Sequence, residues 1–167
     1  VYDGTASQAL GSPVWFFLRS TGGAYRARYF VWIKGGWSIA DTQSSAYGTL
    51  DKALGTHWGD PATWEFSTPI IFNETNGMIC HDLTLTGLTG GTLGADGAAI
   101  VMQFTEDGQV YSARRPQTLG VHGARNTPLK WTRVGYFKDQ AAFRFSGDSN
   151  AIFSAMRLDA ALEPLAW

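Results

Sequence analysis

The sequence has few of the residues that hold a chain together by means other than a core. Its single cysteine, Cys80, excludes an internal disulfide and a cysteine-based zinc cluster. Charged residues make up 16% of the 167 residues, too few for a disordered acidic or basic chain. No apolar run approaches the roughly 18 residues that a transmembrane helix needs. The chain must therefore bury a core of its own, with Cys80 as a small buried residue.

Aromatic residues and glycine are abundant. Aromatic residues reach 14%, including seven tryptophans, and there are 20 glycines. Aromatic side chains favour strands, and glycine is frequent in the tight turns between them. The Ala/Glu/Lys/Arg/Leu heptads of a coiled coil are missing. The composition predicts an all-β protein.

Residues 1–40 predict part of a propeller blade. Strand-like runs at 14–18, 25–33 and 37–40 are separated by glycine turns. Short strands with aromatic ends and glycine turns are typical of such blades, and one incomplete blade cannot bury its own faces. We expect the rest of the blade upstream or on another subunit. The start of the chain lacks the features of a signal peptide, and we expect an excised piece of a longer protein.

The remaining residues predict a connecting segment and a second domain. Residues 41–62 are rich in Ser, Thr and Gly and are expected to be a linker or an ordered loop, with at most two helical turns. Over 63–167, six or seven strand-like segments recur, and Asp107-Gly108 is a hairpin signal. This spacing predicts a β-sandwich, although the same pattern also allows a small barrel. The last segment, 151–162, fits a strand or a short helix.

The sequence shows no recognisable active site. The three histidines, His57, His81 and His122, have no metal-ligand spacing. His81 shares the alternation of Leu83 and Leu85, so we expect a hydrogen-bonded core histidine. Neither a nucleophile elbow nor a phosphate-binding loop is present. We therefore expect no catalytic residues, no metal and no cofactor.

Charge is distributed unevenly along the chain. Residues 1–110 carry 5 basic and 10 acidic residues, whereas residues 111–167 carry 8 and 4. Such asymmetry sometimes indicates nucleic-acid binding. Here the basic residues are scattered over predicted strands rather than clustered. The pattern favours an acidic face that meets a basic face, within the fold or between subunits.

The second half carries two motifs that lead to a resemblance. One is the run Trp131-x-Arg133-x-Gly135-x-x-x-Asp139, and the other is Phe143-Arg144-Phe145. Together with the preceding strands from Trp64 onward, they resemble the C-terminal region of tail-hub proteins of short-tailed double-stranded DNA phages. These are the packaged-DNA stabilisation or tail-nozzle proteins. Residues 1–40 resemble the last propeller-type blade before that region.

The resemblance implies a structural component of the virion tail that is not an enzyme. Such proteins form a homo-oligomeric ring, sixfold in the expected case, below the portal and its adaptor. They retain packaged DNA and anchor needle or fibre proteins. Contact with DNA is expected to be independent of sequence, and no membrane segment is expected.

The motif residues have expected structural roles. Residues 129–137 and 141–146 are predicted to form a pair of neighbouring strands, joined at 138–140. Trp131, Phe143 and Phe145 are expected to share the core face of this pair, and Gly135 to allow a bulge or a close strand approach. Strand alternation turns Arg144 outward. The interface residues expected at subunit or intrachain charge contacts are Arg125, Arg133 and Arg144.

Two other functions stay open at this point. Trp37 and Trp58 lie in glycine-rich turns and are the tryptophans expected to be exposed. As stacking platforms they would suit a glycan-binding, receptor-recognition module of a tail fibre. A wall-degrading hydrolase is the third reading, because paired carboxylates carry out glycoside hydrolysis. Its candidate residues are Glu65, Glu74, Asp82 and Glu106.

Overall fold

The computed structural model describes residues 1–20, 23–51, 54–74, 76–88, 98–120, 128–147 and 153–165. The chain divides into two units, Val1–Asp60 and Pro61–Trp167. Each unit is described by itself below. In the described part of the chain no helix is long and apolar enough to cross a membrane.

The first unit begins with a short helix, α1 (Gly4–Leu10). Asp3 caps it by accepting a hydrogen bond from the Ala6 backbone N–H, and Gly11 ends it in the left-handed region at φ 68°. The predicted strand over 14–18 is wrong. This run is tied to the N-terminus by an isolated bridge, Tyr2 to Trp15, and by single backbone bonds rather than by a ladder.

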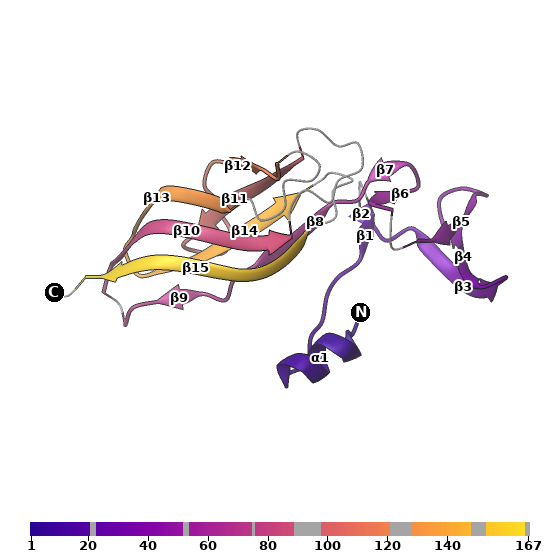
Figure 1. Ribbon diagram of the computed structural model, residues 1–167, viewed down its shortest axis with the longest axis horizontal. Coiled ribbons are helices and arrows are strands. Elements are labelled where there is room, and N and C mark those ends of the chain that lie inside the picture. Colours follow the sequence, from indigo (N-terminus) through magenta and orange to yellow (C-terminus); the bar gives the residue numbers. More distant parts are fainter. Residues whose placement is uncertain are drawn as a thin grey trace. The chain divides into compact units, whose positions relative to one another are not determined.

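The main element of the first unit is an antiparallel three-stranded sheet in the order β3-β4-β5. Its strands are β3 (Ala27–Ile33), β4 (Gly36–Asp41) and β5 (Tyr47–Leu50) (Figure 1). Gly35, at φ 79°, makes the turn between the first two strands. Two small pairs accompany the sheet: β1 (Arg19–Ser20) with β2 (Gly23–Ala24), and β6 (Thr56–His57) with β7 (Asp60–Pro61).

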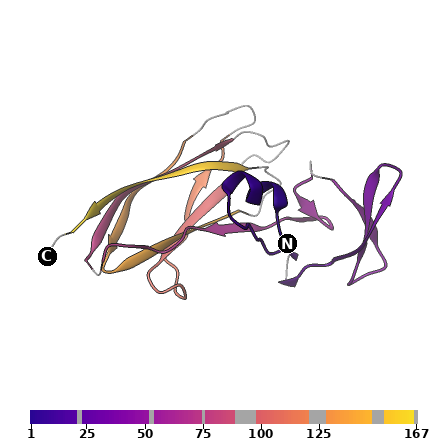
Figure 2. The ribbon, with the colours of Figure 1, turned by 90° about the horizontal axis from the view of Figure 1, so that it is seen from below.

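The second unit is a β-sandwich, as predicted, and its described strands do not close into a barrel. One sheet has the order β13-β10-β15, and the other has the order β12-β11-β14-β8 with β9 also paired to β14. Both are antiparallel, and Figure 2 shows their long strands from below. The strands are β8 (Trp64–Ser67), β9 (Ile71–Phe72), β10 (Met78–Leu88), β11 (Ala99–Thr105), β12 (Arg115–Thr118), β13 (Leu129–Phe137), β14 (Gln140–Gly147) and β15 (Ser154–Pro164).

The strands β13 and β14 were expected to pair as neighbours, and this expectation is wrong. They follow one another along the chain but belong to opposite sheets. Their apolar faces meet across the interior, where the Trp131 and Phe145 rings lie 5.5 Å apart and the Phe137 and Phe143 rings 5.9 Å apart. Alternation fixes which face a side chain is on, but it does not fix the partner strand.

The core lies between these two sheets. Phe137, Phe143 and Phe145 are almost fully buried, and burial of such a side chain stabilises a fold by about 1.5–3 kcal/mol. Further buried apolar side chains come from both sheets: Met78, Cys80, Leu83, Leu85, Ile100, Met102, Leu129, Trp131 and Val134. The sandwich thus has a contiguous apolar interior of its own.

A β-bulge in the first of these sheets corrects the expectation for His81. The register of β10 shifts between Cys80 and Asp82, against both β13 and β15. The shift puts Cys80 into the core with Leu83, and His81 outward, where its side chain is 56% exposed. His81 Nε2 lies 2.7 Å from Glu163 Oε2. The predicted core histidine is therefore wrong, because a bulge inverts the alternation on one side of it.

Candidate functional site

One long side of the sandwich is closed by side chains of β12 that bond to the edge of β13. Arg115 Nη2 donates to the Thr132 carbonyl at 2.7 Å, and its Nη1 lies 3.3 Å from the Val134 carbonyl. Gln117 Nε2 donates to the Lys130 carbonyl at 2.9 Å. An unpaired strand edge can add another strand, and side chains that occupy its carbonyls block such pairing.

Trp131 completes the same closure from the other direction. Its indole Nε1–H donates to the Arg115 carbonyl at 2.8 Å, while its ring packs in the core beside Phe145. A buried indole N–H without an acceptor would cost free energy. Trp131 and Arg115 therefore tie β13 and β12 together reciprocally.

Arg133 lies in β13 opposite the register shift of β10, between Thr132, which pairs with Asp82, and Gly135, which pairs with Cys80. It has a left-handed backbone at φ 51° and is exposed. Its carbonyl lies 3.4 Å from Arg115 Nη1, but its guanidinium has no hydrogen-bond or ion-pair partner among the described residues. Gly135, two residues on, has φ 155°, a conformation that disfavours a side chain. The bulge thus presents Arg133 to solvent from a sheet edge.

Arg144 lies on the outer face of the second sheet. Its Nη2 donates to Gln103 Oε1 at 2.9 Å, and its guanidinium carbon lies 3.4 Å from the centre of the Tyr111 ring. Glu65 is 3.7 Å from Nη1. The buried Nε has no partner within the described residues. The described charge contacts of Arg144 are therefore within the chain.

The other expected site residues are placed as follows. Trp131, Phe143 and Phe145 are 2%, 1% and 0% exposed and line the core. Arg125 lies outside the described residues. Trp37 is 44% exposed, whereas Trp58 is half-buried. The Trp58 ring lies 3.4 Å from the position that a Cβ on Gly48 would take, so it packs against β5.

The first unit contains an ion pair that sequence reasoning missed. Arg26 Nε and Nη2 donate to the two Asp41 carboxylate oxygens at 3.0 and 2.5 Å. Ser44 Oγ and the Gln43 backbone N–H also donate to this carboxylate. These donors, Arg26 above all, hold the pKa of Asp41 well below its usual range. The sequence signal for this ion pair was the opposite charge of Arg26, directly before β3, and Asp41, the last residue of β4.

His57 lies in the same unit as this ion pair. Its Nδ1 is 3.0 Å from Ser20 Oγ, and its ring stacks on Tyr25 with centroids 5.1 Å apart. Burial lowers the pKa of His57, and the nearby positive charge of Arg26 lowers it further. Since Ser20 Oγ also accepts the Arg26 backbone N–H, these polar groups hold the strands together.

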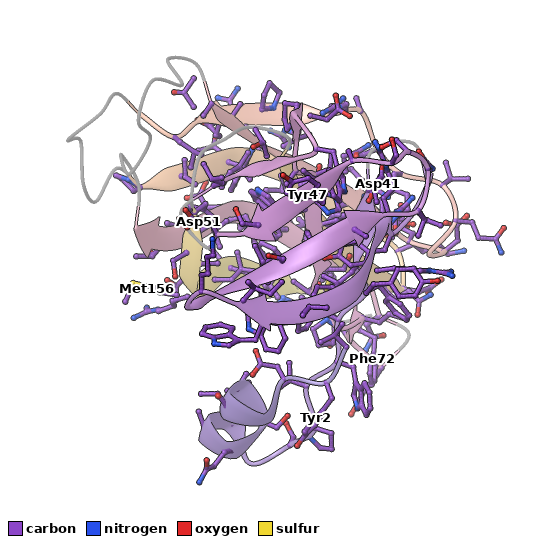
Figure 3. The ribbon with its side chains drawn as sticks, turned by 90° about the vertical axis from the view of Figure 1, so that its right-hand side faces the viewer. Tyr2, Asp41, Tyr47, Asp51, Phe72 and Met156 are labelled. Atoms are coloured by element: carbon purple, nitrogen blue, oxygen red, sulfur yellow. The ribbon has the colours of Figure 1, made fainter. Side chains whose placement is uncertain are left out.

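The three-stranded sheet of the first unit leaves large apolar side chains in solvent. Trp32 and Trp37 are cross-strand partners in edge-to-face contact at 5.3 Å, and Leu50 pairs with Trp37 on β5. Their exposed fractions are 57%, 44% and 53%. Asp41, at the end of β4, and Tyr47, at the start of β5, are labelled in Figure 3. Neighbouring exposed apolar side chains of this kind are typical of surfaces that contact another molecule.

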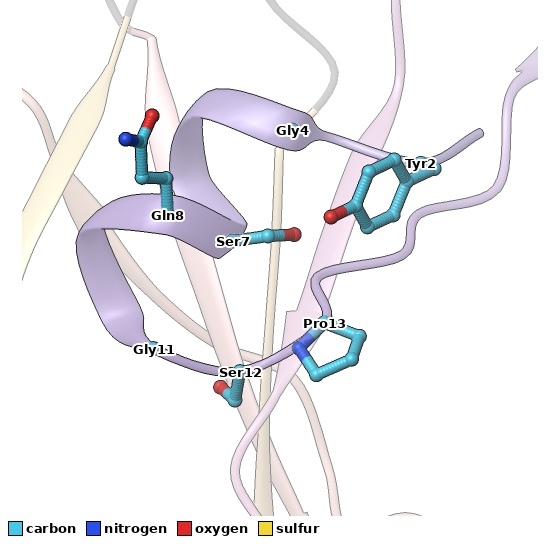
Figure 4. Close-up of a pocket in the computed structure, with 7 residues that line it drawn as sticks. All are labelled: Tyr2, Gly4, Ser7, Gln8, Gly11, Ser12 and Pro13. Carbon is cyan, nitrogen blue, oxygen red and sulfur yellow. The ribbon is translucent and has the colours of Figure 1, made fainter.

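A hollow beside α1 is lined by small and polar side chains (Figure 4): Tyr2, Gly4, Ser7, Gln8, Gly11, Ser12 and Pro13. No group of three or more metal-ligating side chains comes together in the described ranges. The exposed apolar sheet face of the first unit is suited to contacts with protein.

Comparison with known families gives two matches that follow one another along the chain. A family model described as bacteriophage P22 Gp10, beta-sandwich, matches residues 63–163. A second model, described as bacteriophage P22 Gp10, beta-propeller, matches residues 1–55. No curated protein matches the chain.

Proposed function

The chain belongs to the bacteriophage P22 Gp10 family of packaged-DNA stabilisation proteins, and on this premise we propose that it forms a ring in the tail hub. Membership makes it a structural component of a virion tail. The finer role is a homo-oligomeric ring, sixfold, below the portal and its adaptor. In that position it would retain packaged DNA and anchor needle or fibre proteins.

The observation that carries the proposal is the match of both parts of the chain, propeller first and sandwich second, to one structural family. The exposed apolar residues of β3, β4 and β5 support it, because a blade needs neighbours on its faces. A ring of identical subunits provides repeated surfaces of this kind.

The role is proposed to be non-catalytic. The support for this is that the family is a structural one. The family does not favour the glycan-binding alternative. Contact with DNA, where it occurs, is proposed to be independent of sequence, because contacts to the phosphate backbone carry no base information.

Light scattering over a range of concentrations tests the ring directly. We expect the purified chain to form a closed oligomer, six subunits in size, whose mass stays constant once assembly is complete. A monomer at every concentration would contradict a ring built by these residues. The tail role is tested separately by phage assembled without this protein, which are expected to lose packaged DNA. Stably filled heads would contradict that role.

A further inference from the structure

The sandwich has one basic and one acidic long side. The basic edge consists of β12, β13 and the residue before β12, which carry four basic and no acidic residues: Arg114, Arg115, Lys130 and Arg133. Of these, Lys130 is ion-paired with Asp82 of the adjacent β10 at 2.8 Å. The acidic edge consists of β8, β9, β15 and the loop after β9, which carry Glu65, Glu74, Asp159 and Glu163. Its one basic residue, Arg157, is paired with Asp159 at 2.7 Å.

The strands of each edge lie together, and the two edges lie on opposite sides. β12 and β13 are joined by Arg115 and Trp131. On the other side, the ring of Trp64, the first residue of β8, stacks on the ring of Phe153, the residue before β15, at 5.9 Å. β13 and β15 are the two edge strands of one sheet, and β12 and β8 are the two edge strands of the other. In Figure 1, β12 and β13 form the upper side of the sandwich, and β15 and β9 form its lower side.

Each edge has charged side chains that are exposed, whereas Arg115 and Asp159 are half-buried. Arg114 and Arg133 are exposed and have no side-chain partner among the described residues. On the acidic edge, Glu74 is exposed, and the side chain of Glu163 is 57% exposed. These groups keep most of their charge available to a partner, because surface pairs such as Glu163 with His81 are weak.

Both edges also expose apolar surface beside the charges. Met156 and Phe72, each 70% exposed, project from β15 and β9 (Figure 3), and Tyr136 on β13 is 52% exposed. Interfaces combine apolar contacts of this kind with a charged rim. The outer side of β15, an eleven-residue strand, is paired by no described strand, whereas Arg115 and Gln117 close β13.

We propose that the basic edge of one copy of this chain docks against the acidic edge of the next copy. The contact is heterologous, because two different surfaces meet, and a heterologous contact builds a ring when the rotation between neighbouring copies closes. The proposal rests on the ring of the proposed function and names the contact through which that ring closes. Opposite charge on the two edges would set the orientation and reject the reversed arrangement.

Charge reversal with a matched control tests this contact. Arg133→Glu is expected to raise the apparent dissociation constant of the oligomer at least about tenfold, because like charges then face each other. Lys138→Glu is the control, since Lys138 is also exposed and changes the net charge equally but lies in the turn after β13. Higher salt should weaken the wild-type oligomer. Protection of Cys80 from thiol reagents checks that each variant is folded.

Mixing two double variants gives the decisive result. Arg114→Glu/Arg133→Glu has two acidic edges, and Glu74→Lys/Glu163→Lys has two basic edges. Each alone is expected to remain monomeric, and an equimolar mixture is expected to assemble to the wild-type mass. If the wild type assembles and each double variant assembles as well alone, the edge contact is wrong while the ring stands. If the wild type is a monomer throughout, the ring fails and the edge contact fails with it.

Discussion

Arg115 is expected to stabilise the sandwich through the edge of β13. Arg115→Met keeps an unbranched side chain of similar length but removes the guanidinium that bonds to Thr132 and Val134. A hydrogen bond from a charged donor contributes about 1.5–3 kcal/mol when well formed. Only the 2.7 Å bond to Thr132 has short geometry, and the others are 3.3 and 3.4 Å long. Since water can reach the freed carbonyls, we expect Arg115→Met to lower the free energy of unfolding by about 1–3 kcal/mol.

Cys80 provides an assay that reports on the sandwich alone. It is the one cysteine, it is 1% exposed in the core, and burial raises its thiol pKa to about 11. Labelling of Cys80 with a thiol reagent as urea rises therefore follows unfolding of the second unit. In Arg115→Met the urea concentration at the labelling midpoint should fall. The dependence of the unfolding free energy on urea should stay unchanged, because only stability differs between the two proteins.

Arg114→Met is the matched control for this measurement. Arg114 precedes Arg115, carries the same charge and is exposed, without a described side-chain partner. Its replacement is expected to change stability by less than about 0.5 kcal/mol, as is usual for such surface positions. Equal midpoints for the two variants would refute the role of Arg115, as would unchanged hydrogen exchange at the β13 amides.

Three further outcomes are expected. Because the pKa values of His57 and Asp41 are lowered in the folded state, the first unit should lose stability as pH falls below about 6.5 and again below 3.8. Urea unfolding followed by tryptophan fluorescence at several pH values checks this. A stability that does not change with pH would count against both groups. Trp131→Phe should cost about 1–3 kcal/mol by leaving the Arg115 carbonyl without its donor; a neutral result in the Cys80 assay contradicts the bond. Gly87→Ala should cost about 1–3 kcal/mol, since its Cβ would lie 2.5 Å from a backbone oxygen of β15; an unchanged labelling midpoint would show that β15 yields freely.

The sequence predicted those parts of the sandwich that depend on local pattern. Residues 129–137 were predicted as a strand and form β13 over the same range. The alternation around Phe143 and Phe145 follows from strand geometry, because successive side chains point to opposite faces. The family also followed from the sequence, since the Trp131 and Phe143 motifs carry the resemblance.

The parts that failed depend on contacts between distant segments. The bulge at His81 results from a register shift against two neighbouring strands, which no local alternation reveals. The opposite-sheet placement of β13 and β14 is a tertiary choice as well. Arg115 reaches the β13 carbonyls only because the two sheets bring their edges together, so its role was invisible before the fold was known.

The left-handed backbone of Arg133 has a consequence for how the protein can change. A residue with a Cβ costs about 1–2 kcal/mol in this conformation, and glycine does not. Arg133→Gly should therefore leave the chain as stable or more so while deleting the guanidinium. Selection for heat resistance alone is expected to accept glycine here, whereas selection for assembly is expected to keep arginine. Competition between the wild type and the Arg133→Gly variant under each selection would show whether the strained backbone is kept for an assembly contact.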